Sequence, residues 1–333
     1  MNSISLRVIA CVAALLGSPL DSARADPQVK ELAVLKGPVG DVWQLAFSPD
    51  GTKIVACAWR GLGGISVWDL ATKKRSAEFT RHRSTEHAVA FSPDGKVVAS
   101  CTALSGEFIR IWDPETGREV TKFKDEEGST RLAFSPDGKT LVAGDFMSED
   151  LRRWDTDGWK RLPDLPGHKG GVWSIAFSRD GSKMAVGTES GDIRLWDTKT
   201  GKATATLVGH TDIVRTLAFS ENGKELFSTG SDQTIRRWDI ATEKARVVSI
   251  KHPAGFLGMA FNPSRTLLAT GDNKHMVTLW DTTTGKKLAT LEGHSDWVRA
   301  VAFSPDGKTL ASGGRRKDGA QEIRLWRIEE NGR

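Results

Sequence analysis

The stretch GHTDIVRTLAFSENGKELFSTGSDQTIRRWD, residues 209–239, decides the fold of this chain because its pattern is written seven times. An Ala-Phe pair and a later Trp-Asp pair mark each copy. The signature tryptophans are Trp68, Trp112, Trp154, Trp196, Trp238, Trp280 and, in a degenerate Trp-Arg pair, Trp326. They recur every 42 to 46 residues, and the copies fill the chain from Lys30 to Ile328. A period of this length predicts an architecture in which each copy is one structural unit.

Within one copy, polar and apolar residues alternate over four short runs, at residues 214–219, 225–228, 234–238 and 245–249. Such short alternations, separated by turn residues, predict β-strands. Asp-Gly and Thr-Gly pairs supply the tight turns between the strands. These turns begin at Pro49, Pro93, Pro136 and Pro305 between the first two strands, and at Thr116, Thr200 and Thr284 between the last two. Four strands in each of seven copies predict an all-β, seven-bladed β-propeller.

The Trp-Asp pairs, together with Gly-His pairs such as Gly209-His210, resemble the WD-repeat β-propeller family over essentially the whole chain after residue 25. A Tol-type periplasmic propeller shares the Ser-Pro-Asp-Gly-Lys turns, but the Trp-Asp and Gly-His pairs favour the WD-repeat family. The resemblance implies a buried hydrogen-bond relay within each blade. Copy five has the full set, namely His210, Ser228, Asp232 and Trp238.

The signature histidine stands nine residues before each Ala-Phe phenylalanine. It is present as His82, His168, His210, His252 and His294, and is replaced by Pro38 and Asp125 in copies one and three. The Ser and Asp positions of the relay also vary between copies. They are occupied by Val186 and Ser190 in copy four and by Thr270 and Lys274 in copy six. Copy seven has Ser312 at the Ser position, and its longer loop leaves undecided whether Asp318 takes the Asp position. A Ser-His-Asp set suggests a hydrolase, but a set that recurs in degraded form in several copies is a property of the repeated fold and not of a single active site. We therefore assign the relay a structural role and no catalytic residue.

Two other local features lead to separate expectations. His87 lies off the histidine frame, and its spacing from His82 and Glu86 fits no helical metal motif, so we expect a surface loop there and no metal site. Cys57 and Cys101 hold equivalent places in successive copies, about 10 Å apart if the sheets pack normally, so we expect free thiols rather than a disulfide.

The two ends of the chain carry further information. Arg7, the apolar run Val8 to Leu16 and the Ala23-Arg24-Ala25 site are typical of a cleaved secretory signal, so we expect residues 1–25 to be removed and residues 26–333 to form the propeller. A lipoprotein signal at Cys11 and a leader on a cytosolic protein are the alternatives. Residues 31–35 resemble an outer strand, and copy seven lacks one after Trp326, so the N-terminal strand is expected to complete the last blade.

The top face, where the histidine loops and the loops of variable length meet in the family, is the expected binding surface. The variable loops begin at Trp59, Ala103, Asp145 and Arg315. Trp and Arg dominate interface hot spots, and the candidates are Trp43, Trp59, Trp173, Arg215, Trp297 and Arg299. Two alternatives remain: the tryptophans pack under the loops as extra core, and Arg315, Arg316 and Lys317 form a solvated loop.

The charge balance of the chain and the residues expected to line the central channel limit which classes of function fit the sequence. The balance of 47 Lys+Arg against 42 Asp+Glu is spread along the chain and disfavours an electrostatic nucleic-acid binder. The positions expected to face the channel are Gln44, Ala88, Arg131, Ser174, Thr216, Gly258 and Ala300. They contain no His or carboxylate ring, so we expect no cofactor and no enzyme. The resulting prediction is a periplasmic or secreted scaffold that binds protein or peptide partners without membrane insertion. The alternatives are a glycan or small-molecule binder and a lactonase-like or quinoprotein-like enzyme.

Overall fold

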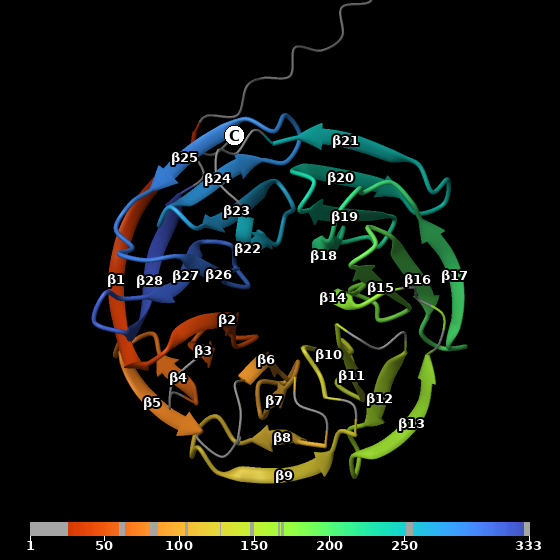
Figure 1. Cartoon of the computed structure of the whole chain (residues 1–333), viewed down its shortest axis with the longest axis horizontal. Coiled ribbons are helices and arrows are strands. Elements are labelled where there is room, and N and C mark those ends of the chain that lie inside the picture. Colours follow the sequence, from red (N-terminus) through yellow and green to blue (C-terminus); the bar gives the residue numbers. More distant parts are fainter. Residues whose placement is uncertain are drawn as a thin grey trace, which may run out of the picture.

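The chain folds into a ring of seven four-stranded antiparallel sheets, as a computed structural model shows (Figure 1). The structure describes residues 26–59, 64–79, 86–103, 106–126, 128–146, 150–165, 167, 170–250 and 256–329. The predicted signal and the histidines His82, His168 and His252 lie outside these ranges, as does the side chain of Trp59. The predicted all-β, seven-bladed propeller is confirmed.

In blades one to six the strands run outward from the centre of the ring in chain order, and in blade seven the outermost strand is the N-terminal one. The innermost strands are β2 (Asp41–Phe47), β6 (Glu86–Phe91), β10 (Arg131–Phe134), β14 (Val172–Phe177), β18 (Val214–Phe219), β22 (Phe256–Phe261) and β26 (Val298–Phe303). The second strands are β3 (Lys53–Trp59), β7 (Val98–Thr102), β11 (Thr140–Gly144), β15 (Lys183–Thr188), β19 (Glu225–Gly230), β23 (Leu267–Asp272) and β27 (Thr309–Arg315). Each innermost strand ends at the phenylalanine of an Ala-Phe pair.

The third strands carry the signature tryptophans. They are β4 (Ile65–Asp69), β8 (Phe108–Trp112), β12 (Leu151–Asp155), β16 (Ile193–Asp197), β20 (Thr234–Asp239), β24 (Val277–Asp281) and β28 (Ala320–Glu329). The outermost are β5 (Lys74–Phe79), β9 (Glu119–Lys124), β13 (Lys160–Leu165), β17 (Lys202–Leu207), β21 (Ala245–Ser249), β25 (Lys287–Leu291) and β1 (Gln28–Val39). We number the blades one to seven by their innermost strands, from β2 to β26.

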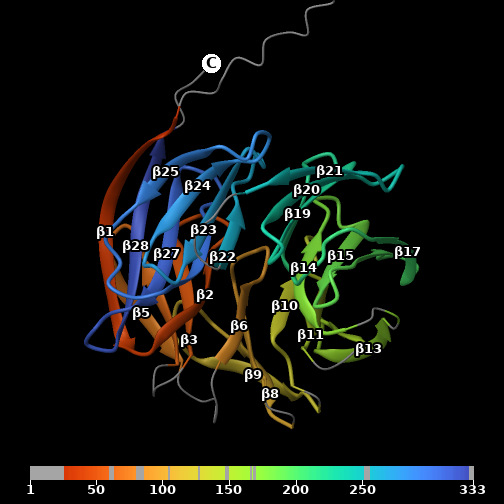
Figure 2. The same ribbon diagram turned by 45° about the horizontal axis from the view of Figure 1, so that its top comes forward.

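The ring closes through the N-terminal strand, as the sequence predicts. Strand β1 pairs antiparallel with β28, with Leu35 opposite Ile323, so blade seven contains both ends of the propeller. Figure 2 shows β1 running along the outer side of β28. Closure in this way leaves no blade with a missing strand.

The hydrophobic core lies between neighbouring blades. Val55 and Cys57 of blade one, for example, pack with Val89 and Trp112 of blade two. All seven signature tryptophans are buried, with exposed fractions of 1–4%. Cys57 and Cys101 are free and buried within these layers, as expected for small apolar-like side chains.

The turns fix which end of each strand faces which side of the ring. Gly51 has a φ of +72°, and its N–H donates to the Ser48 carbonyl oxygen over 2.9 Å, closing the predicted hairpin between β2 and β3. A side chain would strain this left-handed backbone. Since adjacent strands are antiparallel, the innermost strands begin on the same side of the ring as the loops between second and third strands. We call this side the top face.

Candidate functional site

The four residues of the predicted relay lie together inside blade five. His210 Nδ1 is 2.9 Å from Asp232 Oδ2, and His210 Nε2 is 2.7 Å from Ser228 Oγ. The Trp238 indole N–H donates to Ser228 Oγ over 2.8 Å. Because a carboxylate only accepts, His210 donates from Nδ1, and in the neutral ring Nε2 accepts the Ser228 hydroxyl proton. The serine is fully buried and its oxygen already holds the indole, a geometry that suits a structural role.

Removal of the His210 side chain is expected to lower the free energy of unfolding by about 1–3 kcal/mol, because Asp232 and Ser228 would each lose a buried partner. Burial alone would raise the pKa of Asp232, but hydrogen bonds from His210 and Thr234 hold that pKa well below its usual range. Urea unfolding of His210→Ala measures the effect. An unchanged midpoint would contradict the structural assignment.

In blades six and seven the relay is altered in a way that preserves the tryptophan hydrogen bond. Trp280 donates to Thr270 Oγ1 over 2.8 Å in blade six, and Trp326 donates to Ser312 Oγ over 2.8 Å in blade seven. In blade seven His294 Nε2 also lies 2.7 Å from Ser312 Oγ. Asp318, left open by the sequence, pairs with Arg316 instead.

His294 makes acid stability testable. Burial, together with the positive charges of Arg324 and His275, lowers the pKa of His294 to about 3, although the Glu322 carboxylate, which Arg324 also binds, lies 3.7 Å from His294 Nδ1. An unfolded histidine titrates near pH 6.5, so below that pH the unfolded chain binds a proton that the folded chain does not. This histidine should therefore reduce stability by up to about 1.4 kcal/mol per pH unit as the pH falls from about 6.5 to 4. His294→Gln should flatten the pH dependence by that amount in urea titrations. Parallel curves for variant and wild type would exclude this histidine as the source.

Blade three replaces the relay with a buried ion pair that the sequence analysis missed. Asp125 stands at the histidine position and lies 3.4 Å from Arg152 Nη1, with both side chains almost fully buried. Ser129 donates to the same carboxylate, and Arg152 also donates to the Gly128 carbonyl oxygen. An arginine two residues before the signature tryptophan also occurs in blades two, four, five and seven, as Arg110, Arg194, Arg236 and Arg324. The available signal was the aspartate at the histidine position of blade three, which this recurrent arginine could neutralise.

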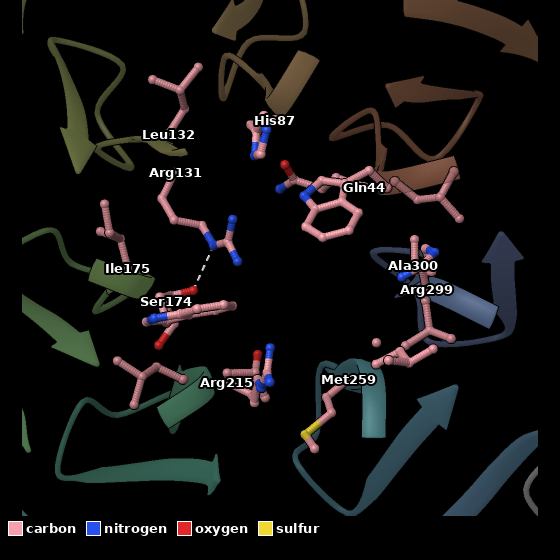
Figure 3. Close-up of a pocket in the computed structure, with 18 residues that line it drawn as sticks. Gln44, His87, Arg131, Leu132, Ser174, Ile175, Arg215, Met259, Arg299 and Ala300 are labelled. Carbon is pink, nitrogen blue, oxygen red and sulfur yellow. Dashed lines mark hydrogen bonds between the residues drawn. The ribbon is translucent and has the colours of Figure 1, made fainter. Parts of the chain in front are cut away.

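The centre of the top face holds a pocket of about 340 Å³. It is lined by residues of the innermost strands of all seven blades, and Figure 3 shows these side chains around one opening. The charged and aromatic lining residues are Trp43, His87, Arg131, Trp173, Arg215 and Arg299. The pocket lies near the lower end of the volume range of about 300–1,000 Å³ that is usual for ligand sites.

A β-bulge determines which residues reach this pocket. In six blades the pairing of the first two strands is irregular at the fourth residue before the anchor phenylalanine, as between Val172 and Ser174. A bulge leaves one residue unpaired and re-aims its side chain. Consequently Trp173 and its neighbour Ser174 both line the pocket, although simple alternation would place them on opposite faces.

The predicted binding residues are partly gathered at this pocket. Trp43, Trp173, Arg215 and Arg299 line it, and Trp297 lies beside it, with its ring centroid 4.7 Å from the Arg299 guanidinium. Trp297 is 42% exposed. Trp43 also packs against the core between blades one and two, as the alternative of extra core expected for the tryptophans. The side chain of Trp59 lies outside the described part of the chain.

The expectation that His87 belongs to a surface loop is wrong. His87 lies in β6, lines the pocket and meets the ring of Trp43 edge-on at a centroid distance of 5.7 Å. Glu86, expected in the same loop, is buried at the start of that strand. The error arose because spacing was compared only with helical metal motifs. The position of His87, four residues before the anchor phenylalanine Phe91, indicated that it belongs to a strand.

Arg131 is the second residue that the predicted binding ring omitted. Its Nε–H donates to the Trp173 carbonyl oxygen over 2.6 Å, and Nη1 donates to the Thr130 carbonyl oxygen over 2.7 Å. Burial and the charge of Arg215 lower the pKa of Arg131 to about 10, so it remains charged at neutral pH. Burial and the charge of Arg131 lower the pKa of His87 to about 4, so His87 is neutral there.

Aromatic rings hold the cations in place. The Arg215 guanidinium lies 4.6 Å from the centroid of Trp173, and that of Arg131 lies 5.5 Å from the same ring. Trp173 in turn stacks on Phe146 at 4.3 Å. Cation–π contacts of this kind orient guanidinium groups without neutralising them. The pocket is therefore a preformed, positively charged site with aromatic walls.

The part of the chain that the structure describes contains no group of three or more His, Cys, Asp or Glu side chains arranged for a metal ion. Within the same residues, no helix has the length and hydropathy needed to cross a bilayer. The lining of the pocket contains three arginines and no carboxylate. This arrangement can bind an anionic or aromatic group.

A comparison with protein families agrees with the geometry. The family described as WD40, "WD domain, G-beta repeat", matches residues 29–69, 73–113, 159–197, 201–239, 246–281 and 285–327. The repeat that carries the Asp125–Arg152 pair in place of the relay lies between the second and third matches. No curated protein matches the chain. Since the matches cover well over half of its length, the chain belongs to the WD40 repeat family.

Proposed function

We propose that this WD40 propeller is a non-enzymatic, exported scaffold that binds a segment of a partner protein on its top face. WD40 propellers commonly serve as protein-interaction scaffolds. The observation that carries the proposal is the central pocket, in which Trp43, Trp173, Arg215 and Arg299 converge from separate blades. Exposed or half-buried Trp and Arg on a rigid framework are the residue types that anchor partners.

The alternatives weigh less on the chemistry of the site. A general acid–base enzyme needs a titratable pair within hydrogen-bond reach of a substrate, whereas the pocket lining offers one histidine whose low pKa keeps it neutral. A neutral glycan would stack on the tryptophans but would leave the arginines unmatched.

A crosslinking pull-down from the extracytoplasmic fraction of the native cell tests the scaffold. The baits are residues 26–333 and the variant with Trp43→Ala, Trp173→Ala and Trp297→Ala. The matched control carries Val120→Ala and Val247→Ala, two exposed apolar residues on the outer strands β9 and β21. We expect the control to capture the same partner as wild type and the tryptophan variant to lose it. Equal capture by all three baits would exclude the top face as the binding surface.

Export has its own test. If residues 1–25 form a cleaved signal, the protein recovered outside the cytoplasm should begin at Asp26, as intact-mass measurement would show. A cytoplasmic product that retains Met1 or begins at Asn2 would exclude export, and the scaffold would then act inside the cell.

A further inference from the structure

The central pocket contains three arginines, of which Arg299 lies 3.6 Å from the Asp41 carboxylate, while Arg131 and Arg215 have no such partner among the described residues. The lining contains no Asp or Glu. Burial lowers the pKa of Arg215, which the charge of Asp212 partly offsets, although Asp212 is not a lining residue. Buried charge is costly unless it is paired and hydrogen-bonded. Two adjacent guanidinium groups that repel one another are therefore a site that a bound anion would stabilise.

The hydrogen bonds of these arginines leave donors for a ligand. The Nε and Nη1 groups of Arg131 are held by backbone carbonyl oxygens, and no hydrogen bond from its Nη2 to the described residues is formed. Arg215 donates from Nε to Ser231 Oγ over 2.8 Å, which fixes its side chain. Figure 3 shows both side chains reaching into the opening from neighbouring sides. A guanidinium carries five N–H donors in a planar fork that matches an oxyanion.

Trp173 gives this charge pair a defined geometry. Both guanidinium groups lie within 5.5 Å of its ring centroid, and they come from blades three and five on either side of blade four. A hydrophobic wall beside two positive charges limits the access of water to them and strengthens their attraction for an anion. The pocket volume of about 340 Å³ suits one or two side chains rather than a folded domain.

We propose that Arg131 and Arg215 form an oxyanion-binding subsite within the top-face pocket, which receives an acidic side chain of the bound protein segment. The inference rests on the proposed scaffold function and names the chemistry of its partner. A carboxylate and a phosphate share this chemistry, so the test must separate them.

The test uses capped pentapeptides with glycine around one central residue: Glu, Gln or phosphoserine. Methyl glucuronide serves as an acidic sugar probe. Binding is followed by the NMR shift of the Trp173 indole N–H, assigned with Trp173→Phe. We expect the Glu or the phosphoserine peptide to shift this signal with an affinity that falls as NaCl rises, and the Gln peptide to leave it unchanged. The stronger of the two acidic peptides identifies the oxyanion.

Arg215→Gln is the decisive variant, because Arg131 is tied to two backbone carbonyls and its removal endangers folding. We expect Arg215→Gln to weaken binding of the acidic peptide about tenfold or more, and Arg215→Lys to recover part of that loss. The matched control is Arg118→Gln, which removes an exposed arginine from the turn between β8 and β9. It should bind as wild type does.

Several results would overturn the subsite. These are equal shifts with Glu and Gln peptides, no shift with either acidic peptide at millimolar concentration, or equal binding by Arg215→Gln and Arg118→Gln. A shift with methyl glucuronide alone would assign the site to acidic glycans and contradict the protein-segment proposal. If Arg215→Gln still captures the partner that the triple tryptophan variant loses, the scaffold stands and the oxyanion subsite falls.

Discussion

Replacing Arg152 by methionine should lower the free energy of unfolding by about 3–5 kcal/mol. Arg152 and Asp125 are almost fully buried inside blade three, and the substitution would leave the carboxylate of Asp125 without its cation. Methionine fills a similar volume, so the loss would come from the unmatched charge and not from a cavity. Urea denaturation followed by tryptophan fluorescence measures it.

Two further variants separate the effect of the unmatched Asp125 charge from the effect of lost packing. Arg153 is the next residue of β12, and its side chain bonds to the Pro163 carbonyl oxygen on the exposed side of the blade, so Arg153→Met should cost less than about 1 kcal/mol. The double variant Arg152→Met with Asp125→Asn removes both charges and should recover part of the loss. A double variant no more stable than Arg152→Met would show that lost packing, and not charge, dominates.

Replacing Leu35 by alanine should cost about 2–5 kcal/mol, because this side chain fixes the closing strand to the ring. Leu35 is 2% exposed and packs with Val42 of blade one and with Ile323 and Leu325 of β28. Its loss would create a cavity where the two ends of the propeller meet. Thermal unfolding and size-exclusion chromatography would report the loss of stability and any opening of the ring.

The same strand provides the control for this prediction. Leu32 lies three residues earlier in β1 and is 38% exposed, so Leu32→Ala should change stability by no more than about 0.5 kcal/mol. Similar losses for both variants would mean that the pairing of β1 with β28, rather than the buried side chain, secures closure.

The fold was predictable because its determinants are local and repeated. The alternation in residues 214–219 and the turn glycine Gly51 each specify structure within a few residues, and seven copies reinforce the same pattern. Closure by residues 31–35 was predictable for the same reason, because the missing outer strand of blade seven could be counted. The replacement of the relay in blade three was predictable only in part. Asp125 was identified at the histidine position, but its partner Arg152 was not.

The sequence by itself determined the seven blades, the strand that closes them and most of the aromatic residues at the top face. Only the tertiary structure decided that Arg131, His87 and Arg215 share one pocket. The β-bulges at the starts of the innermost strands override simple alternation and turn two successive residues toward the channel. Ring geometry then brings Arg131 and Arg215, 84 residues apart, to the same tryptophan. Local pattern cannot specify such a meeting, because it depends on how three separate blades are packed around one axis.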